Sequence, residues 1–488
     1  MTRLKTLYKQ TFIYGIATVV PKMLSFLLVR LHTDKSVLNN VSDYGDVSLI
    51  FAYFILFNII LAYGMETAFF RFINSTEDKI KVIGTSAISL IISSSAVLIL
   101  GYFFKDNISS TIHIDSEHFV LVLFILFFDA LVIIPFAYLR ALGKPVKYTL
   151  VKITNVLINL GLNFLFLIFL EDLAGGSSFW NNFYIPNFEI HYIFIANLIA
   201  SVATLILLSS FYFKLRYNFE WFLWKKMFRY AFPVLIAGIA FSINESFDRI
   251  LLERLLPKEL SKAAIGTYSA CYKLALFMTL FSTAYRLGIE PFFFSSFDKR
   301  DAKNNYASIL EIFVILGSLI LLLVVVFIDF LKLILIPNEA YWEAMSIVPI
   351  LLLAYLFLGI YHALSVWYKV TDRTNIGAYI SIFGALLTLI INIIFIPLIG
   401  YLASAIATLS AYSMMALLSY LLGQKYYKIP YNISRIIIYL FLSVLFSALS
   451  FYRFRGEYII GLILIFILIT IVLYNEKTTI RKFIKPEQ

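Results

Sequence analysis

The chain has 488 residues, of which 61% are hydrophobic and only 14% are charged. Soluble globular domains are about 45–50% apolar and about 25% charged, so this composition excludes that class and indicates a polytopic membrane protein. The single cysteine, Cys271, excludes a disulfide framework and a cysteine-cluster metal site. The net charge of +11 does not indicate nucleic-acid binding, because basic residues of membrane proteins gather in cytoplasmic loops.

Apolar runs long enough to cross about 30 Å of hydrocarbon recur along the whole chain. Each predicts one spanning helix, and we count about fourteen, so the expected fold is an all-α membrane protein. The expected helices of the first half cover 7–31, 46–70, 80–104, 118–139, 146–170 and 192–213. Those of the second half cover 227–252, 265–289, 306–328, 342–367, 375–396, 401–422, 433–451 and 458–474.

The Lys and Arg residues beside these runs fall mainly on the face that holds the N-terminus, as in the segments 3–9, 140–147 and 477–485. Because such residues accumulate on the cytoplasmic side, this bias predicts that both termini are cytoplasmic. The longest loop on the opposite face, 171–191, has no Lys or Arg and is too short for a soluble catalytic domain. We expect it to be a short lid or a connector.

A weak internal repeat relates the two halves of the chain. When Phe12 is aligned with Phe232, Gly45 and Gly266 fall at nearly the same distance downstream, although Pro21 and Pro233 do not superpose. The repeat predicts two pseudo-symmetric lobes of six helices each. The predicted domains are 1–216, 217–424 and a C-terminal part, 425–488, with two further helices and a basic tail.

Lys22 follows Pro21 near the middle of the first apolar run. A lysine at the bilayer centre costs roughly 2.5 to 3.5 kcal/mol, so it should face water, a partner or a substrate instead of lipid. It lies about ten residues from either end of the run, roughly 15 Å at helical rise, which is far for one side chain to reach. We expect Lys22 to face a cavity, with a structural ion pair as the alternative.

The other ionisable residues inside the spans cluster in the paired helices of the two halves. The candidates for binding an anionic substrate in a cavity are Lys22, Arg249, Lys273 and Arg286. The candidates for ion coupling or for pairing inside the cavity are Glu66, Glu245, Asp248 and Glu290. Local ion pairs are an equal alternative, because Glu245, Arg249 and Glu253 are spaced by four residues, as are Arg286 and Glu290. Lys273 has no carboxylate within one turn of its own helix.

Asp129 and His362 are single polar residues within apolar runs. For each of them we expect a hydrogen bond from one helix to another.

Motifs of nucleotide hydrolysis and zinc proteolysis are absent from the sequence. It contains neither G-x-x-x-x-G-K-[ST] nor H-E-x-x-H. We predict no catalytic residues, no metal site and no cofactor.

Four stretches resemble the polysaccharide transporter family. They are YGMETAFFRF at 63–72, FDRILL at 247–252, YRLGIEPFFF at 285–294 and SVWYKVTD at 365–372. This family belongs to the multidrug/oligosaccharidyl-lipid/polysaccharide exporter superfamily, which also holds multidrug and toxin extruders and the lipid II flippases. The resemblance implies two six-helix lobes and two extra C-terminal helices. It also implies a flippase that moves undecaprenyl-pyrophosphate-linked oligosaccharide across the bacterial inner membrane, from the cytoplasmic to the periplasmic leaflet, by alternating access.

The motif KMLSF at 22–26 is similar to the basic-x-Leu-small-Phe of the first helix in lipid II flippases. The resemblance implies that Lys22 faces the central cavity and contacts the lipid pyrophosphate. Where those proteins often have arginine, this chain has lysine, which binds phosphate as a point charge and not as a bidentate fork.

Two other functions stay open. An ion-coupled antiporter of drugs or small molecules in the same superfamily should have an acidic chamber, whereas Lys22, Arg249 and Lys273 are basic. A polysaccharide polymerase or ligase should have an external loop rich in Arg or His, whereas 171–191 contains one histidine and no arginine. The partners expected for a flippase are the lipid-linked oligosaccharide, the bilayer and other assembly proteins, with the chain itself a monomer.

Overall fold

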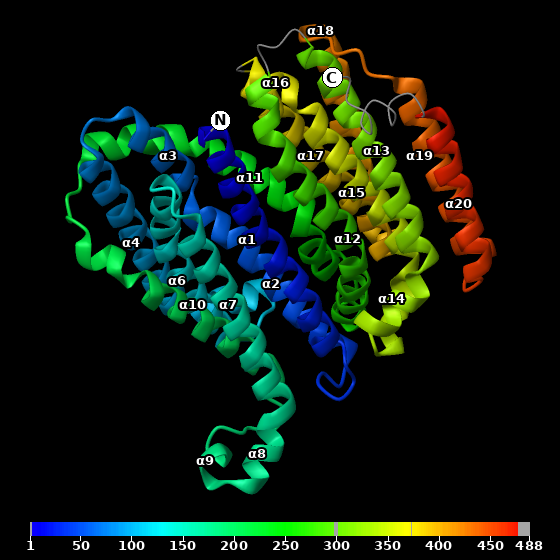
Figure 1. Ribbon diagram of the computed structural model, residues 1–488. Coiled ribbons are helices and arrows are strands. Elements are labelled where there is room, and N and C mark those ends of the chain that lie inside the picture. The colour runs from blue at the N-terminus through cyan, green and yellow to red at the C-terminus, as the bar shows by residue number, and fades with distance from the viewer. Residues whose placement is uncertain (1, 297–300, 372, 477–488) are drawn as a thin grey trace. The chain divides into compact units, whose positions relative to one another are not determined.

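The computed structural model describes residues 2–296, 301–371 and 373–476, with the side chains at 2–12, 14, 288 and 290–296 outside the description. Every regular element in this described part is a helix (Figure 1). Within the described residues, fourteen continuous or broken helices are long and apolar enough to span a membrane, and each overlaps one of the runs expected from the sequence. The prediction of an all-α, multi-pass membrane protein is therefore confirmed.

The chain forms two compact units, unit 1 (Met1–Gly266) and unit 2 (Thr267–Gln488). Unit 1 contains α1 (Thr2–His32), α2 (Val41–Ala62), α3 (Met65–Ser75), α4 (Lys79–Phe103), α5 (Lys105–Ile112), α6 (Ser116–Ala141), α7 (Pro145–Phe164), the π-helix η1 (Leu165–Phe169), α8 (Leu170–Gly176), α9 (Ser178–Asn181), α10 (Glu189–Lys214), α11 (Trp221–Leu255) and the start of α12 (Lys258–Ser296). Unit 2 continues with α13 (Ala302–Val326), α14 (Ile328–Leu335), the 3₁₀-helix η2 (Glu339–Ser346), α15 (Ile347–Leu364), α16 (Val366–Val370), α17 (Thr374–Ile399), α18 (Tyr401–Tyr426), α19 (Ile433–Ala448), the π-helix η3 (Leu449–Arg453) and α20 (Tyr458–Asn475).

The boundary between these units differs from the repeat boundary at 216/217. In unit 1, α11 packs against α2, α3 and α4, so its contacts join it to the helices that precede it. Units defined by packing therefore need not coincide with lobes defined by a sequence repeat. The lobe boundary at 216/217 stays a prediction.

Hydrogen bonds inside the bilayer region connect the helices of unit 1. Ser201 of α10 donates to Asp129 Oδ1 of α6 at 2.8 Å, which confirms the helix-to-helix bond expected for Asp129. A second bond, 2.8 Å long, joins His32 Nε2 of α1 to Asn163 Oδ1 of α7. Polar side chains in hydrocarbon pair across helices because the alternative is an unsatisfied polar group. These bonds fix α1 on α7 and α10 on α6, in agreement with their extensive packing.

The second span is broken in its second half. Tyr63 and Gly64 adopt left-handed backbone angles, with φ of 31° and 72°, so α2 ends there and α3 begins. The break lies against α11, where a Cβ on Gly64 would stand 2.5 Å from the carbonyl oxygen of Ala231. Glycine is therefore required at position 64 for both its backbone angle and its lack of a side chain.

The segment after α7 extends away from the other helices of unit 1. It runs through η1 into the short helices α8 and α9, which project beyond the neighbouring helices α6 and α10 (Figure 1). The loop expected at 171–191 is thus partly helical.

Unit 2 is built on close packing of α15 and α17 against α18. Small residues of α18, including Ala403, Ala407 and Ala411, are fully buried, which lets the helix backbones approach closely. Trp367 of α16 is also buried and donates from Nε1 to the carbonyl oxygen of Ser419 at 3.0 Å. The C-terminal helices α19 and α20 pack on α13 (Figure 1), where Arg435 bonds Glu476 at 3.1 Å.

Candidate functional site

Lys22 lies partly buried near the middle of α1. Pro21 lies inside this helix and does not end it. Proline removes the one backbone hydrogen bond that its N–H would give to the carbonyl four residues earlier, a loss that membrane helices tolerate. One turn after Lys22, Ser25 Oγ donates to the carbonyl oxygen of Lys22 at 2.6 Å. The helix therefore continues through Lys22, and the cavity expected beside this lysine stays a prediction.

Glu66 lies in the first turn of α3, directly after the break at Gly64. Its Oε1 accepts a 2.7 Å bond from Nη1 of Arg140, which lies in the last turn of α6. The Arg140 guanidinium also stacks on the ring of Phe70, 4.6 Å from its centroid. Glu66 thus joins α3 to α6 at the end of unit 1 that holds the α6–α7 turn, which we call the α6–α7 end.

Arg249 and Asp248 are both buried in α11. Arg249 Nη1 lies 2.8 Å from Asp248 Oδ1 and 3.2 Å from the carbonyl oxygen of Glu245. The structure thus pairs Arg249 with its neighbour Asp248, a contact that spacing by four residues does not indicate. Glu245 lies one turn earlier on the same helix and is partly buried.

Glu253 also has partners that the four-residue spacing does not predict. Its Oε1 bonds Nδ1 of His113, which follows α5, and its Oε2 lies 3.1 Å from Nε of Arg254. Arg254 in turn donates to the carbonyl oxygen of Thr111. These contacts join the end of α11 to the end of α5, on the side of unit 1 that holds the α1–α2 turn, which we call the α1–α2 end.

Gly45 of α2 and Gly266 of α12 lie at this α1–α2 end, each against the backbone of the other's helix. A Cβ on Gly45 would stand 1.9 Å from the carbonyl oxygen of Lys262, and a Cβ on Gly266 would stand 2.1 Å from that of Val41. The contact is reciprocal, because Val41 precedes Gly45 by the same four residues as Lys262 precedes Gly266. A two-fold axis between equivalent segments produces this reciprocity. The glycines that the repeat aligns are therefore in contact.

An ion pair accompanies this contact. Nζ of Lys262 lies 2.8 Å from Asp46 Oδ1 and 3.0 Å from Oδ2. The α1–α2 end is thus closed by backbone packing and by paired charges.

The remaining predicted site residues belong to α12. Lys273 is partly buried and Arg286 is exposed, and thirteen residues separate them along the helix, roughly 20 Å at helical rise. They do not form one contact site. The side chain of Glu290 lies outside the described residues, so its predicted pair with Arg286 stays a prediction.

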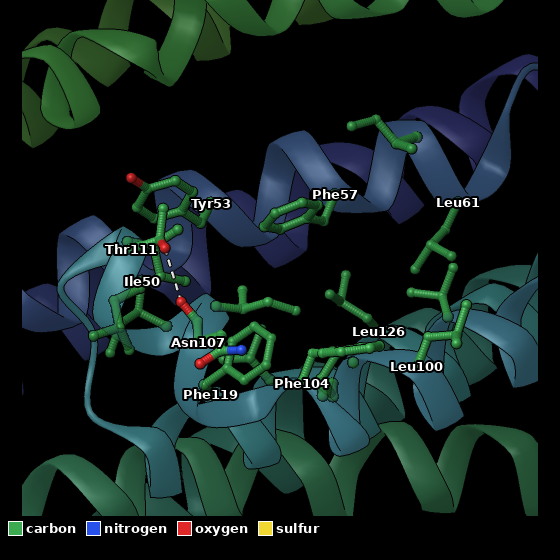
Figure 2. A pocket seen from close by; sticks show the side chains of 18 residues that line it. Ile50, Tyr53, Phe57, Leu61, Leu100, Phe104, Asn107, Thr111, Phe119 and Leu126 are labelled. Atoms are coloured by element: carbon green, nitrogen blue, oxygen red, sulfur yellow. Dashed lines mark hydrogen bonds between the residues drawn. The ribbon is translucent and has the colours of Figure 1, made fainter.

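Two cavities lie within unit 1. The apolar cavity, of about 560 Å³, lies among α2, α4, α5 and α6. Figure 2 shows Phe57 and Leu61 of α2 facing Leu100 and Leu126, with polar groups only at one edge, around Asn107. No charged side chain lines this cavity, so it can hold hydrocarbon but offers nothing to bind a phosphate.

The basic cavity, of about 390 Å³, lies among α4, α6, α7 and α10 at the α6–α7 end. Its charged lining residues are all cations, namely Lys144, Lys147, Lys214 and Arg216. The basic cavity therefore has positively charged lining residues, whereas the apolar cavity has no charged ones.

No group of three or more His, Cys, Asp or Glu side chains that could hold a metal occurs in the described ranges.

Residues 7–281 match the family described as Polysaccharide biosynthesis protein, and residues 233–394 match the MatE family. The chain belongs to the polysaccharide biosynthesis protein family. No curated protein matches it.

Solved structures of similar fold accompany the family match. The lipid II flippase MurJ in an inward closed conformation is 16% identical, with a TM-score of 0.73 over 95% of this chain and 99% of that chain. An inward-facing MATE multidrug resistance transporter of the MOP superfamily is 14% identical, with a TM-score of 0.65 over 84% and 97%. A MOP superfamily transporter from Pyrococcus furiosus, described as having a binding pocket of reversed polarity, is 14% identical, with a TM-score of 0.60 over 86% and 95%. The chain therefore has the fold of these transporters.

Within this polysaccharide biosynthesis protein, sequence reasoning missed the partners of the predicted charges. Arg140, His113 and Lys262 lie 74, 140 and 216 residues from the carboxylates that they bond. No spacing rule connects residues so far apart. A basic turn such as 140–147 is the only signal that could have indicated the cluster at the α6–α7 end.

Proposed function

We propose that this chain is a flippase that moves undecaprenyl-pyrophosphate-linked oligosaccharide from the cytoplasmic to the periplasmic leaflet, for synthesis of O-antigen, capsule or exopolysaccharide. The observation that carries the proposal is the family match of residues 7–281. The likeness of fold to a lipid II flippase over 95% of the chain supports it. The proposal includes a location in the bacterial inner membrane, both termini in the cytoplasm and a monomeric state.

The cations of the spans supply the chemistry that such a cargo needs. A lipid pyrophosphate carries about two negative charges, which strong charge-assisted hydrogen bonds from Lys or Arg neutralise. Lys22 in α1 and Lys273 in α12 are partly buried cations within spanning helices. We assign them to the cargo phosphates, with Arg249 and Arg286 as further cations of the transport path. Glu66, Glu245, Asp248 and Glu290 are then the carboxylates that balance or couple these charges.

Alternating access needs one end that closes tightly and can separate. The contact of Gly45 and Gly266 and the ion pair of Asp46 and Lys262 provide such a closure at the α1–α2 end. Direct backbone packing brings the two helices together without long side chains. When the helices separate, water can replace the partners of a few exposed ion pairs at little cost.

A deletion strain tests the proposal. Without the gene, lipid-linked oligosaccharide should accumulate in the cytoplasmic leaflet, and the wild-type chain should clear it. Lys22→Ala and Lys273→Ala should fail to restore clearance, whereas Lys22→Arg should restore it because the charge is kept. Full rescue by both alanine variants would defeat the site assignment, and no accumulation in the deletion strain would defeat the function.

An ion-coupled antiporter of small molecules is the second candidate. It is favoured by the MatE match of residues 233–394 and by the likeness to a multidrug transporter. In that case the deletion strain should become sensitive to cationic drugs without accumulating lipid-linked oligosaccharide. Glu66→Gln should then abolish drug resistance, since an antiporter needs a carboxylate that titrates.

A further inference from the structure

None of the residues assigned to transport lines the basic cavity. Its four cations come from three places in the chain: Lys144 from the α6–α7 turn, Lys147 from α7, and Lys214 and Arg216 from the end of α10 and the segment after it. No carboxylate lines it. In the part of the chain that the structure describes, none of the four side chains forms an ion pair. Bringing like charges together costs free energy unless an anion joins them.

The position of Lys144 follows from the way α6 ends. Gly143 has a φ of 64°, its N–H bonds the carbonyl of Arg140 at 3.0 Å, and the Lys144 N–H bonds that of Leu139 at 3.0 Å. These two bonds form a Schellman motif, which needs glycine at the left-handed position. Pro145 then opens α7 directly, so the first turn of α7 also lies beside the cavity. The N-terminus of a helix favours an anion through its free N–H groups.

Contacts with α4 hold the backbone around Arg216 in place. The carbonyl oxygens of Arg216 and Asn218 lie against Gly84 of α4, where an added Cβ would stand 2.8 Å and 2.6 Å from them. The N–H of Glu220 also bonds Thr85 Oγ1 at 3.1 Å. The segment 215–220 is therefore fastened across α4, and it presents Arg216 to the cavity.

The rest of the cavity wall is apolar. Pro135 and Leu139 of α6 and Leu208 of α10 line it, and Tyr138 and Ser210 add hydroxyl groups. A cluster of cations above an apolar wall, at the end of membrane-spanning helices, matches a lipid with an anionic head and a hydrocarbon tail. A free phosphate would use the cations and leave the wall without a partner.

We propose that the basic cavity binds an anionic phospholipid of the adjoining leaflet, with its phosphate between Lys144, Lys147, Lys214 and Arg216 and an acyl chain along α6 and α10. This site does not depend on the proposed function. The single negative charge of the bound phosphate offsets part of the positive charge of the four cations, and the lipid bridges α6, α7 and α10.

Binding is measured on the purified full-length chain in nanodiscs of phosphatidylcholine that contain a small fraction of phosphatidylglycerol, by the amount of phosphatidylglycerol retained per protein. The test variant is Lys147→Gln/Lys214→Gln. The matched control is Lys79→Gln/Lys225→Gln, which removes two lysines of unit 1 that are exposed like Lys147 and Lys214 but do not line the cavity. Each basic residue near an anionic lipid contributes roughly a fivefold change in affinity, so we expect the test variant to bind about 25-fold more weakly and the control to bind like the wild type.

Gly84→Ala provides a second test that keeps every charge. The added Cβ should push the segment 215–220 away and weaken binding by several-fold. Equal phosphatidylglycerol retention by the wild type and the Lys147→Gln/Lys214→Gln variant, with both folded by gel filtration, would overturn the proposal. If the Lys147→Gln/Lys214→Gln variant lost binding of undecaprenyl pyrophosphate but bound phosphatidylglycerol like the wild type, the cavity would be a cargo site and the proposal would be overturned. Loss of flipping in Lys22→Ala with lipid binding intact would leave this site standing and concern the transport path alone.

Discussion

The two ends of unit 1 differ in how their cationic side chains are paired with carboxylates. At the α1–α2 end two cations lie beside carboxylates, Lys262 beside Asp46 and Arg254 beside Glu253, and two glycines bring the backbones together. At the α6–α7 end, Glu66 and Arg140 pair, but the basic cavity keeps four cations with no carboxylate in its lining. Paired charge and close packing favour a closed end, whereas cations without carboxylate partners favour an end that binds anions.

The largest effect is expected at the buried pair of α11. Asp248→Ala would remove a carboxylate that lies 2.8 Å from the buried guanidinium of Arg249, so we expect a loss of about 3 to 5 kcal/mol in the free energy of unfolding. Thermal unfolding of the purified chain in detergent measures it. Asp248→Leu combined with Arg249→Met should recover most of this loss, because no charge is then left buried. An unchanged Tm in Asp248→Ala would show that this pair does not stabilise α11.

Gly45→Ala should have the next largest effect. A methyl group 1.9 Å from a backbone oxygen cannot be relieved by a side-chain rotation, so overpacking should cost about 1 to 3 kcal/mol and hold the helices apart. The measurement is the labelling rate of Val41→Cys by a membrane-impermeant thiol reagent, in a chain with Cys271→Ser, which should rise. Gly266→Ala should behave alike, as the reciprocal contact requires.

Gly161→Ala is the matched control for Gly45→Ala. Position 161 is also a helical glycine, but an added Cβ there meets nothing within 4 Å. This variant should keep or slightly raise stability, because alanine favours helix by about 0.5 to 1 kcal/mol over glycine. Equal behaviour of the two variants would contradict the account of a closely packed end.

The sequence predicts the fold well because spanning helices are read from local hydropathy alone. The partners of the charges are set by tertiary packing between distant segments, so Asp46 with Lys262 could not be predicted. The repeat aligned Gly45 with Gly266 but did not indicate that they touch. Likewise, the run 46–70 predicts one helix, whereas the left-handed angles at Tyr63 and Gly64 divide it. Its signal is the glycine itself, which is also common in unbroken membrane helices.

Glu66→Gln tests the paired charges of the α6–α7 end, and a smaller effect is expected. Both partners are about two-fifths exposed, at 43% for Glu66 and 42% for Arg140, so water screens the pair. The expected loss is about 0.2 to 1 kcal/mol in the free energy of unfolding. A double-mutant cycle with Arg140→Gln measures the coupling. A stability change above this range would place Glu66 with the buried pairs of the other end.

The smallest effect is expected for a charge pair of unit 2. Burial by itself would raise the pKa of Asp329, but hydrogen bonds and attraction from Arg455 and Lys332 outweigh it and hold the pKa below its usual value. A depressed pKa adds stability above the unfolded-state pKa of about 3.9, and this contribution is lost as the pH falls through the folded-state value. Asp329→Asn should lower Tm slightly at pH 7, with the difference disappearing below about pH 4. A Tm difference between Asp329→Asn and the wild type that grows as the pH falls would contradict a lowered pKa of Asp329.

The central claim is that the chain moves an anionic lipid-linked oligosaccharide across the bilayer. Purified protein in vesicles loaded with undecaprenyl-pyrophosphate-linked oligosaccharide tests it most directly, with transfer followed by the glycan that an impermeant glycosidase can reach. Moving two negative charges outward across about 100 mV, inside negative, would release roughly 4.6 kcal/mol, so an imposed potential should speed transfer and its collapse should slow it. The account predicts transfer that needs the protein, responds to the potential, survives Lys22→Arg and fails with Lys22→Ala. Equal transfer in protein-free vesicles, or unchanged rates in Lys22→Ala, would contradict it.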